Sequence, residues 1–310
     1  MIFFVVFIPF VYFELVQKYT IHMKAIPSSE LVLNPDGSIY HLKLKPEQIA
    51  DTVIVVGDQG RVETISAHFD HIEHKVQNRE FVTHTGTYKG KRFTALSTGI
   101  GTDNIDIVVN ELDALVNIDL ENRVLKENHH ALNIIRIGTS GTLMKDIPVD
   151  SVVISKHGLG FDGLMHFYGF EENEQEKVIL QAIKQQLALP KILNKPYLVE
   201  ADETLFNILK PDYFEGITAT ASGFYGPQGR SLRLKASMPD LNEHLNSFKS
   251  GEHRITNFEM ETSALYGLAG LLGHNACTVC AIIANRYNKT YSKDYTVPID
   301  NLIKIVLEKL

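Results

Sequence analysis

The sequence predicts a single α/β domain in which helices cover both faces of a central mixed β-sheet. Two features predict this fold: short β-branched runs alternate with helical stretches, and neither a linker nor a repeat divides the chain. The 310 residues, 44% of them hydrophobic and 22% charged, are enough to bury a sizeable core. These values argue against a disordered, collagenous or coiled-coil chain.

The first half of the chain opens the alternation. Residues 53–57 are a β-branched run closed by Gly57, which is typical of a buried strand. A helical stretch follows Arg61, and an apolar strand is expected at 92–98. The next helix is expected at 104–116, because its apolar residues recur every three or four positions. This apolar face consists of Ile105, Val108, Val109, Leu112 and Leu115.

The second half repeats the pattern after a polar, charged stretch at 120–130, which is expected to be a surface insertion. Short apolar runs predict strands at 134–138, 151–155, 217–222 and 277–284. Longer stretches predict helices at 174–187, 257–272 and 298–310. Strands that alternate with helices in this way favour a sheet buried on both faces.

Residues 1–13 are apolar throughout and are treated separately from the domain. Thirteen residues form a helix of about 20 Å, which is shorter than the roughly 30 Å hydrocarbon core of a bilayer. A signal peptide needs an early basic residue, but none precedes Lys18. We interpret 1–22 as an extension produced by an over-extended start, with the true start near Met23 and the domain at 23–310. A packed or membrane-touching extension and an atypical signal peptide are the alternatives.

Charge and cysteine content restrict the function classes. Thirty Lys and Arg against 37 Asp and Glu give a net charge of −7, which argues against a general nucleic-acid-binding protein but allows a local anion site. Two cysteines cannot form a disulfide framework, so a reducing, cytoplasmic compartment is expected. Cys277 and Cys280 fall within an expected strand and are predicted to be core residues rather than metal or redox groups. His68, His71 and His74 are predicted to lie on a solvated helix face.

Two glycine-rich segments follow expected strands. In Thr98-Gly-Ile-Gly101 and Arg136-Ile-Gly-Thr-Ser-Gly141, glycine allows backbone N–H groups to turn toward an anion, while hydroxyls and Arg136 add donors. Strand-to-loop turns also use glycine for structural reasons, so spacing alone leaves both interpretations open. Neither segment matches a P-loop or a dinucleotide-binding fingerprint.

Two further segments carry groups that suit a nucleoside. The carboxylates of Glu259-Met260-Glu261 stand at the start of an expected helix, where they either cap the helix or accept hydrogen bonds from sugar hydroxyls. Phe224-Tyr-Gly-Pro-Gln-Gly-Arg230 is either a solvated loop or a reader of a planar base. In the second case Gln228 can donate and accept at an amide edge, and Arg230 can donate to a carbonyl.

Seven segments, taken in this order, resemble the nucleoside phosphorylase-I superfamily and within it the uridine phosphorylases. They are 56–61, 78–81, 97–101, 136–141, 224–230, 258–262 and 284–286, and the likeness covers residue 39 to the C-terminus. The resemblance implies a pentosyltransferase of pyrimidine nucleoside salvage that converts uridine and phosphate reversibly to uracil and ribose 1-phosphate. It implies no metal and no cofactor, with inorganic phosphate as co-substrate.

The resemblance also implies a role for each site residue. The phosphate would contact Gly57, Arg61, Arg79, Arg136 and Thr139. The ribose would contact His41, Glu259, Met260 and Glu261. The base would contact Gly141, Phe224, Gln228, Arg230, Ile283 and Arg286. Arg230, Gln228 and Arg136 would be catalytic, because the leaving uracil becomes anionic and the phosphate must be held close to the sugar.

The same resemblance bears on assembly and specificity. Arg79 and His41 would reach a neighbour's site in a homodimer, or in a homohexamer of dimers, with no nucleic-acid or membrane partner. Residues 102–104 (Thr-Asp-Asn) replace the Gly-Pro-Ser of bacterial relatives, which puts the family's interface cation site in doubt, and the insertion at 120–130 resembles dimeric members. Purine-specific relatives carry Ser-Asp where this chain has Ala284-Asn285-Arg286. A purine phosphorylase or nucleosidase, and a non-catalytic nucleoside-binding protein of this fold, are the alternatives.

Overall fold

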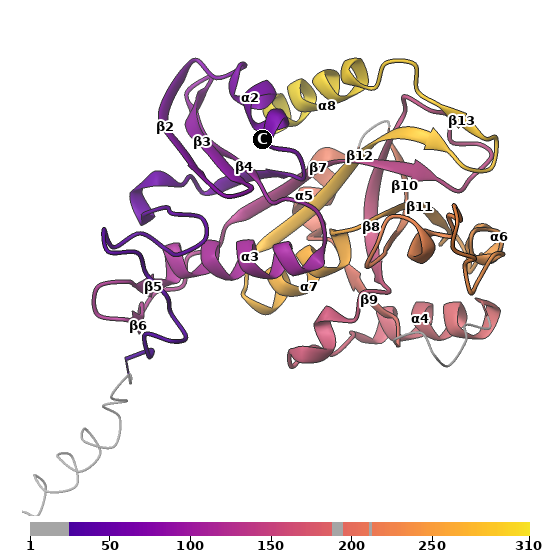
Figure 1. Ribbon diagram of the computed structural model, residues 1–310, viewed down its shortest axis with the longest axis horizontal. Coiled ribbons are helices and arrows are strands. Elements are labelled where there is room, and N and C mark those ends of the chain that lie inside the picture. The colour runs from indigo at the N-terminus through magenta and orange to yellow at the C-terminus, as the bar shows by residue number, and fades with distance from the viewer. Residues whose placement is uncertain (1–24, 188–194, 211–212) are drawn as a thin grey trace, which may run out of the picture.

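The computed structural model describes residues 25–187, 195–210 and 213–310 (Figure 1). The strands are β1 (Thr52–Val56), β2 (His71–Asn78), β3 (Phe81–Tyr88), β4 (Lys91–Ser97), β5 (Ile118–Asp119), β6 (Val124–Leu125), β7 (Asn133–Thr142), β8 (Val152–Gly160), β9 (Tyr197–Glu200), β10 (Phe214–Thr220), β11 (Ile255–Glu259), β12 (Asn275–Asn285) and β13 (Thr290–Tyr291). The α-helices are α2 (Gln59–Ser66), α3 (Thr102–Asn117), α4 (Glu174–Leu187), α5 (Glu203–Leu209), α6 (Leu241–Ser247), α7 (Thr262–Leu271) and α8 (Thr296–Lys309). Short 3₁₀ turns lie at Pro46–Gln48, Leu164–Phe167 and Gly226–Gln228.

One 11-stranded sheet runs through the molecule in the order β13-β12-β8-β10-β11-β7-β1-β4-β3-β2, and β9 pairs with β8. Strands β4, β1, β7 and β12 are parallel to one another, whereas β11 meets β7 antiparallel. Because β12 pairs with both β7 and β8, the strands β12, β8, β10, β11 and β7 close into a barrel. The predicted mixed sheet is therefore confirmed.

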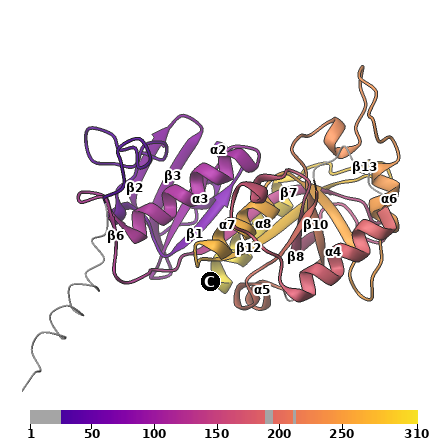
Figure 2. The ribbon, with the colours of Figure 1, turned by 90° about the horizontal axis from the view of Figure 1, so that it is seen from below.

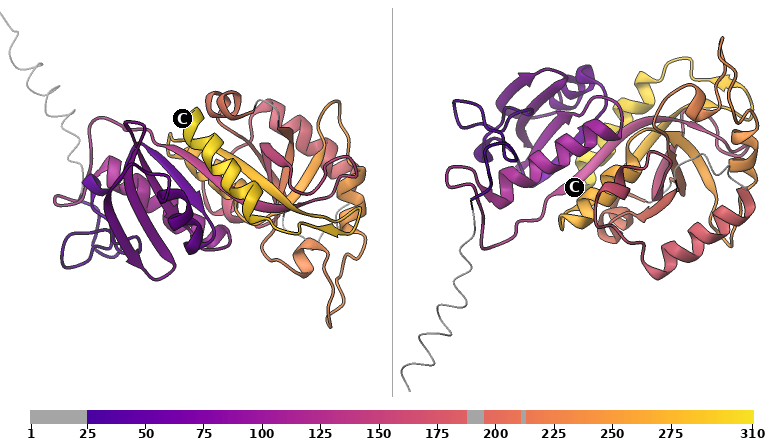
Figure 3. Two further views of the ribbon diagram at one scale, coloured as in Figure 1. Left: turned by 90° about the horizontal axis from the view of Figure 1, so that it is seen from above. Right: turned by 60° about the horizontal axis from the view of Figure 1, so that its bottom comes forward.

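Helices lie on both sides of this sheet. Seen from below, α3 and α7 lie in front of the strands (Figure 2), and seen from above α8 crosses the opposite side (Figure 3). The apolar residues predicted to form one face of α3 are all fully buried in the larger hydrophobic cluster, which joins β1, β4 and β7 to the helices. A second cluster fills the space between the barrel, α4 and α6.

Two sequence-based expectations about secondary structure are wrong. The helix expected at 257–272 begins only at Thr262, because residues 255–259 pair with β10 and β7 as strand β11. His71 and His74 lie on β2 rather than on a helix, since α2 already ends at Ser66 and β2 alternates between exposed and half-buried positions. Strand pairing overrides the helical spacing in both segments: β11 pairs with the distant β10 and β7, and β2 forms a hairpin with the adjacent β3.

Other expectations are confirmed. Both cysteines are buried on β12, and residues 120–130, most of them exposed, form part of a hairpin built on β5 and β6. In the described ranges no helix is long and apolar enough to cross a bilayer. The extension predicted at 1–22 lies outside those ranges.

A histidine on β8 predicts how stability depends on pH. His157 is fully buried, and neither ring nitrogen has a hydrogen-bond partner within the described part of the chain. Its Nε2 lies 3.9 Å from Glu200 Oε1. Burial, together with repulsion from the nearby His253 and Lys156, lowers the pKa of His157 to about 3.

The unfolded chain therefore binds this proton more readily, since a free histidine has a pKa of about 6.5. Stability is lost as the pH falls below that value, and we expect His157 to reduce the free energy of unfolding by about 2 kcal/mol between pH 7 and pH 5. Urea unfolding at both pH values should show this loss in the wild type and its absence in His157→Leu. Equal losses in the two proteins would contradict the prediction.

Candidate active site

A pocket of about 750 Å³ lies at the carboxyl ends of the parallel strands β1, β4, β7 and β12, which is where α/β sheets bind ligands. Twelve of the fifteen residues predicted for the site line it, although they come from distant parts of the sequence. These twelve are Gly57, Arg61, Arg136, Thr139, Gly141, Phe224, Gln228, Arg230, Glu259, Met260, Glu261 and Ile283.

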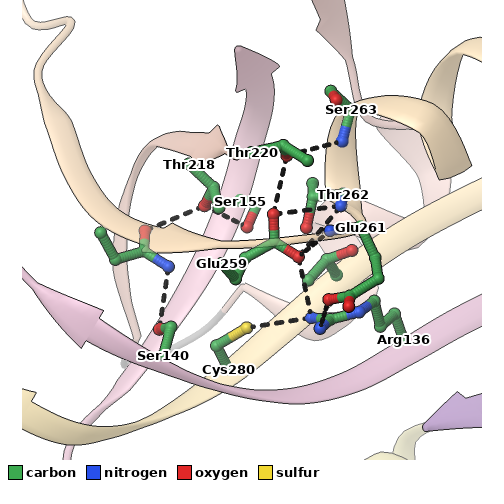
Figure 4. A network of polar contacts seen from close by, with 12 residues as sticks. Arg136, Ser140, Ser155, Thr218, Thr220, Glu259, Glu261, Thr262, Ser263 and Cys280 are labelled. Carbon is green, nitrogen blue, oxygen red and sulfur yellow. Dashed lines mark hydrogen bonds and ion pairs between the residues drawn. The ribbon is translucent and has the colours of Figure 1, made fainter. Parts of the chain in front are cut away.

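Arg136 is held between two carboxylates at one end of the pocket (Figure 4). Its Nη2 donates to Glu261, and its Nη1 lies 3.2 Å from Glu259 Oε2 and donates to Cys280 Sγ at 3.4 Å. Each of the three charged side chains is at most 6% exposed. Gly138 gives the guanidinium its room, because a Cβ there would lie 2.1 Å from Arg136 Nη1. Three of the five guanidinium N–H groups are thereby used, which leaves two for a ligand.

The charges of this cluster are strongly perturbed. Burial opposes ionisation of Arg136, but attraction from Glu261 and Glu259 outweighs it and raises the pKa of Arg136. Burial also raises the pKa of Glu261; Arg136 counteracts this shift and Glu259 reinforces it. Arg136 therefore stays protonated and is the positive centre of this end of the pocket.

Arg61 stands beside this cluster as a second cation. It starts from helix α2, and its Nη1 donates to the carbonyl of Ile137 at 3.3 Å. Burial, and then repulsion from Arg136, lower the pKa of Arg61. A bound anion would relieve the repulsion between these two cations, and Gly57 and Thr139 line the same pocket.

The opposite end of the pocket is built around Gln228, which is 2% exposed. Its Oε1 accepts hydrogen bonds from Arg230 Nη1 at 2.8 Å and from Arg286 Nη2 at 2.5 Å. Arg230 also stacks over Phe224, 3.7 Å from the ring centroid. Burial lowers the pKa of Arg286 to about 9, helped by repulsion from Arg230, and burial also lowers the pKa of Arg230. Among the described residues neither arginine has an ion-pair partner, so this end favours electron-rich ligand atoms.

Three predicted residues do not line the pocket. Arg286 stands behind it and reaches it through Gln228. His41 pairs with Glu111 at 2.7 Å. Arg79 turns its guanidinium toward Tyr40, 5.4 Å from that ring.

The pocket also contains residues that sequence reasoning missed, among them Asp58, Glu80, Asn104, Ser140 and Tyr291. Asp58, Glu80 and Ser140 stand inside the quoted motifs, so their position was a usable signal. Asn104 and Tyr291 lie outside the motif segments, after 97–101 and 284–286 respectively. No local sequence pattern distinguishes them from surface residues.

One cluster outside the pocket has the composition of a metal site: Asp113, His129 and His274 place ligand atoms within 4.8 Å of one another. His274 Nδ1, however, accepts a hydrogen bond from the backbone N–H of Leu132 at 3.1 Å. Its proton must then sit on Nε2, the nitrogen that faces Asp113 Oδ1 at 3.2 Å. A protonated nitrogen cannot coordinate a metal, so the chemistry of this donor set does not fit one.

The fold and the pocket together define an α/β enzyme. One end of its pocket, at Arg61 and Arg136, suits an anion, and the other end, at Gln228, suits a planar polar group. A family model described as the phosphorylase superfamily matches residues 51–307, and the chain belongs to that superfamily. A uridine phosphorylase of Thermococcus kodakarensis is 31% identical over 91% of both chains. A purine nucleoside phosphorylase of the DeoD type from Bacillus thuringiensis is 26% identical over 86% of this chain and 97% of that one.

A solved structure agrees with this assignment. It is a nucleoside phosphorylase of Trypanosoma brucei, described as showing uridine phosphorylase activity. It superposes with a TM-score of 0.82 at 33% identity and covers 90% of this chain and 99% of that one. The resemblance found in the sequence is confirmed.

Proposed function

We propose that this protein is a uridine phosphorylase, which converts uridine and phosphate to uracil and ribose 1-phosphate. The observation that carries the proposal is the polarity of the pocket. Arg61 and Arg136 stand at one end, and Gln228, with Arg230 and Arg286, stands at the other. Glu261, which is bonded to Arg136 and to the backbone N–H of Gly101, keeps carboxylate lone pairs that could accept from sugar hydroxyls.

At the anion end, Arg61 and the two remaining N–H groups of Arg136 would hold phosphate against C1′ of the ribose. Holding the nucleophile in place converts a bimolecular reaction into an effectively unimolecular one. Phosphate oxygen then forms a bond to C1′ as the bond from C1′ to the base nitrogen breaks. The electron pair of that bond moves onto the base.

At the other end, the arginines would stabilise the charge that appears on the leaving uracil. Donors that face developing negative charge in a buried site act more strongly in the transition state than in the ground state. Phe224 would stack on the ring, and Gln228 would read its amide edge. The Gln228 carbonyl already accepts from both arginines, so its NH₂ group is the part available to donate.

The purine alternative rests on the DeoD-type relative. It needs an acid at the base end to protonate the leaving purine, but Asn285 is an amide that holds the carbonyls of Met144 and Ile147. The acidic residues that line the pocket are Asp58, Glu80, Glu259 and Glu261. None of them belongs to the group formed by Gln228, Arg230 and Arg286. The cationic surroundings of Gln228 favour a leaving anion over a leaving protonated base.

We also propose that the enzyme is cytoplasmic and needs neither a metal nor an organic cofactor. We further propose a homodimer, alone or within a hexamer, in which each subunit contributes its Arg79 and His41 to the active site of its neighbour. The support is that both residues lie outside the pocket lining of their own chain.

We expect uracil release from uridine to depend on phosphate by about a hundredfold or more, because the two arginines would otherwise face no nucleophile. Initial rates with and without phosphate, on uridine and inosine in parallel, measure this. Full-rate uracil release without phosphate would identify a hydrolase, and a preference for inosine would identify a purine enzyme.

A further inference from the structure

Glu259 lines the pocket, but protein donors already occupy its carboxylate. Oε1 accepts from the Thr220 hydroxyl at 2.7 Å and from the backbone N–H of Thr262 at 3.1 Å. Oε2 accepts from the backbone N–H of Glu261 at 2.9 Å and faces Arg136 Nη1 at 3.2 Å. A carboxylate offers about four lone-pair sites, so this one has no site left for a sugar hydroxyl.

Glu261 differs from Glu259 in this respect. Its Oε1 accepts from the backbone N–H of Gly101 at 2.8 Å, and its Oε2 accepts from Arg136. Roughly two of its four sites therefore remain for a ligand. The ribose role that the resemblance implies for both glutamates is better matched by Glu261 alone.

The contacts of Glu259 fix the positions of three neighbouring groups. They hold the guanidinium of Arg136, the backbone that carries Glu261, and the first turn of α7, whose N–H groups have no partner within the helix. Figure 4 shows Glu259 at the centre of this arrangement.

Thr220 locks the arrangement from the barrel side. It is fully buried at the end of β10, and its hydroxyl accepts from the backbone N–H of Ser263 at 3.0 Å. Its one hydrogen is then directed at Glu259 Oε1. A single hydroxyl thus ties the first turn of α7 to the carboxylate that orients the anion end of the pocket.

We propose that Glu259 is a positioning residue rather than a ribose ligand, and that the Thr220 hydroxyl holds it in place. The proposal rests on the proposed phosphorolysis of uridine. Hydrogen bonds to charged groups are about twice as strong as neutral ones, so losing this one should be felt by both Arg136 and Glu261.

The test compares Thr220→Val, which replaces the hydroxyl by a methyl group of similar size, with Thr220→Ser, which keeps it. We expect Thr220→Val to lower kcat/KM for both uridine and phosphate about tenfold or more, and Thr220→Ser to stay within about threefold of the wild type. The stabilisation of the protein by inorganic phosphate, read as a shift in Tm, should shrink in the valine variant only.

Thr94→Val is the matched control. Thr94 is equally buried on β4; its hydroxyl also accepts a backbone N–H, from Ala50 at 2.8 Å, and bonds to a side chain, that of Thr85 at 2.8 Å, but it touches no group of the pocket. We expect it to lose stability while kcat/KM and the phosphate-induced shift stay unchanged. If Thr220→Val behaves like Thr94→Val, the positioning role is rejected.

A double-mutant cycle tests the route. If Thr220 acts through Glu259, adding Thr220→Val to Glu259→Ala, which removes the acceptor of its hydrogen bond, should cost little more than Glu259→Ala alone. Fully multiplicative losses would overturn the proposal. A wild type that neither cleaves uridine nor gains stability from phosphate would refute the proposed function, and this inference with it. An active wild type beside an unaffected Thr220→Val refutes the inference alone.

Discussion

Replacing Arg136 by alanine is expected to lower kcat/KM for uridine by about a thousandfold or more. The change removes the more deeply buried cation of the anion end, and it leaves Glu259 and Glu261 buried without their counter-charge. Removing one preorganised donor that faces transition-state charge costs about 2.7–4 kcal/mol, and about 4 kcal/mol corresponds to a thousandfold. The broken ion pair costs about 3–5 kcal/mol of folding stability in addition. The uncompensated carboxylates would also repel phosphate.

Because the same change threatens folding, Arg136→Lys accompanies it. Lysine restores one charge but not the fork that contacts both carboxylates, so activity should be intermediate while Tm recovers. Steady-state kinetics and thermal unfolding of both variants measure these effects. An alanine variant that is folded and keeps a tenth of the wild-type activity would remove Arg136 from the reaction.

The second large effect is complementation between two inactive variants. If Arg79 serves a neighbour's pocket and Arg61 serves its own, Arg79→Ala and Arg61→Ala should each be nearly inactive. After reversible dissociation and mixing, about half of the dimers are mixed, and each mixed dimer has one site with both lesions and one with none. About a quarter of the wild-type activity should return.

This expectation rests on the direction of the Arg79 side chain, which turns away from its own pocket and lies on the Tyr40 ring. Its backbone carbonyl, by contrast, accepts a hydrogen bond from Gln59 at the pocket edge. If both arginines served one site, every site in the mixture would keep a lesion. Mixtures that remain inactive after confirmed subunit exchange would therefore place Arg79 in its own chain's site or outside any site. His41→Ala mixed with Arg61→Ala is an independent repeat.

Much of the site could be predicted from the sequence because its parts are short, contiguous and chemically distinctive. The glycine segment that carries Arg136 and the loop that carries Gln228 are recognisable without knowing the fold. The five residues that form the apolar face of α3 are fully buried, as their spacing predicts.

The remainder depends on pairing that no local pattern encodes. Residues 257–259 look helical, and only their pairing with β10 and β7 makes them part of a strand. Glu259 and Glu261 are identical side chains two positions apart, and their contacts alone separate them. Tyr291 reaches the pocket through the pairing of β13 with the end of β12.

Strand β7 has a further consequence, because it is bonded on both sides where Arg136 stands. Arg136 is in register with Val55 of β1 and with Thr278 of β12. Each amide hydrogen of such a strand is bonded to one of two neighbours that are themselves inside the sheet, so it exchanges with solvent only through large openings that approach unfolding of the domain. Phe224 and Tyr225, by contrast, are half exposed on a loop outside the sheet. The amide hydrogens around Arg136 should therefore exchange slowest and those around Phe224 and Tyr225 fast, so that substitutions in this loop should disturb the anion end of the pocket little.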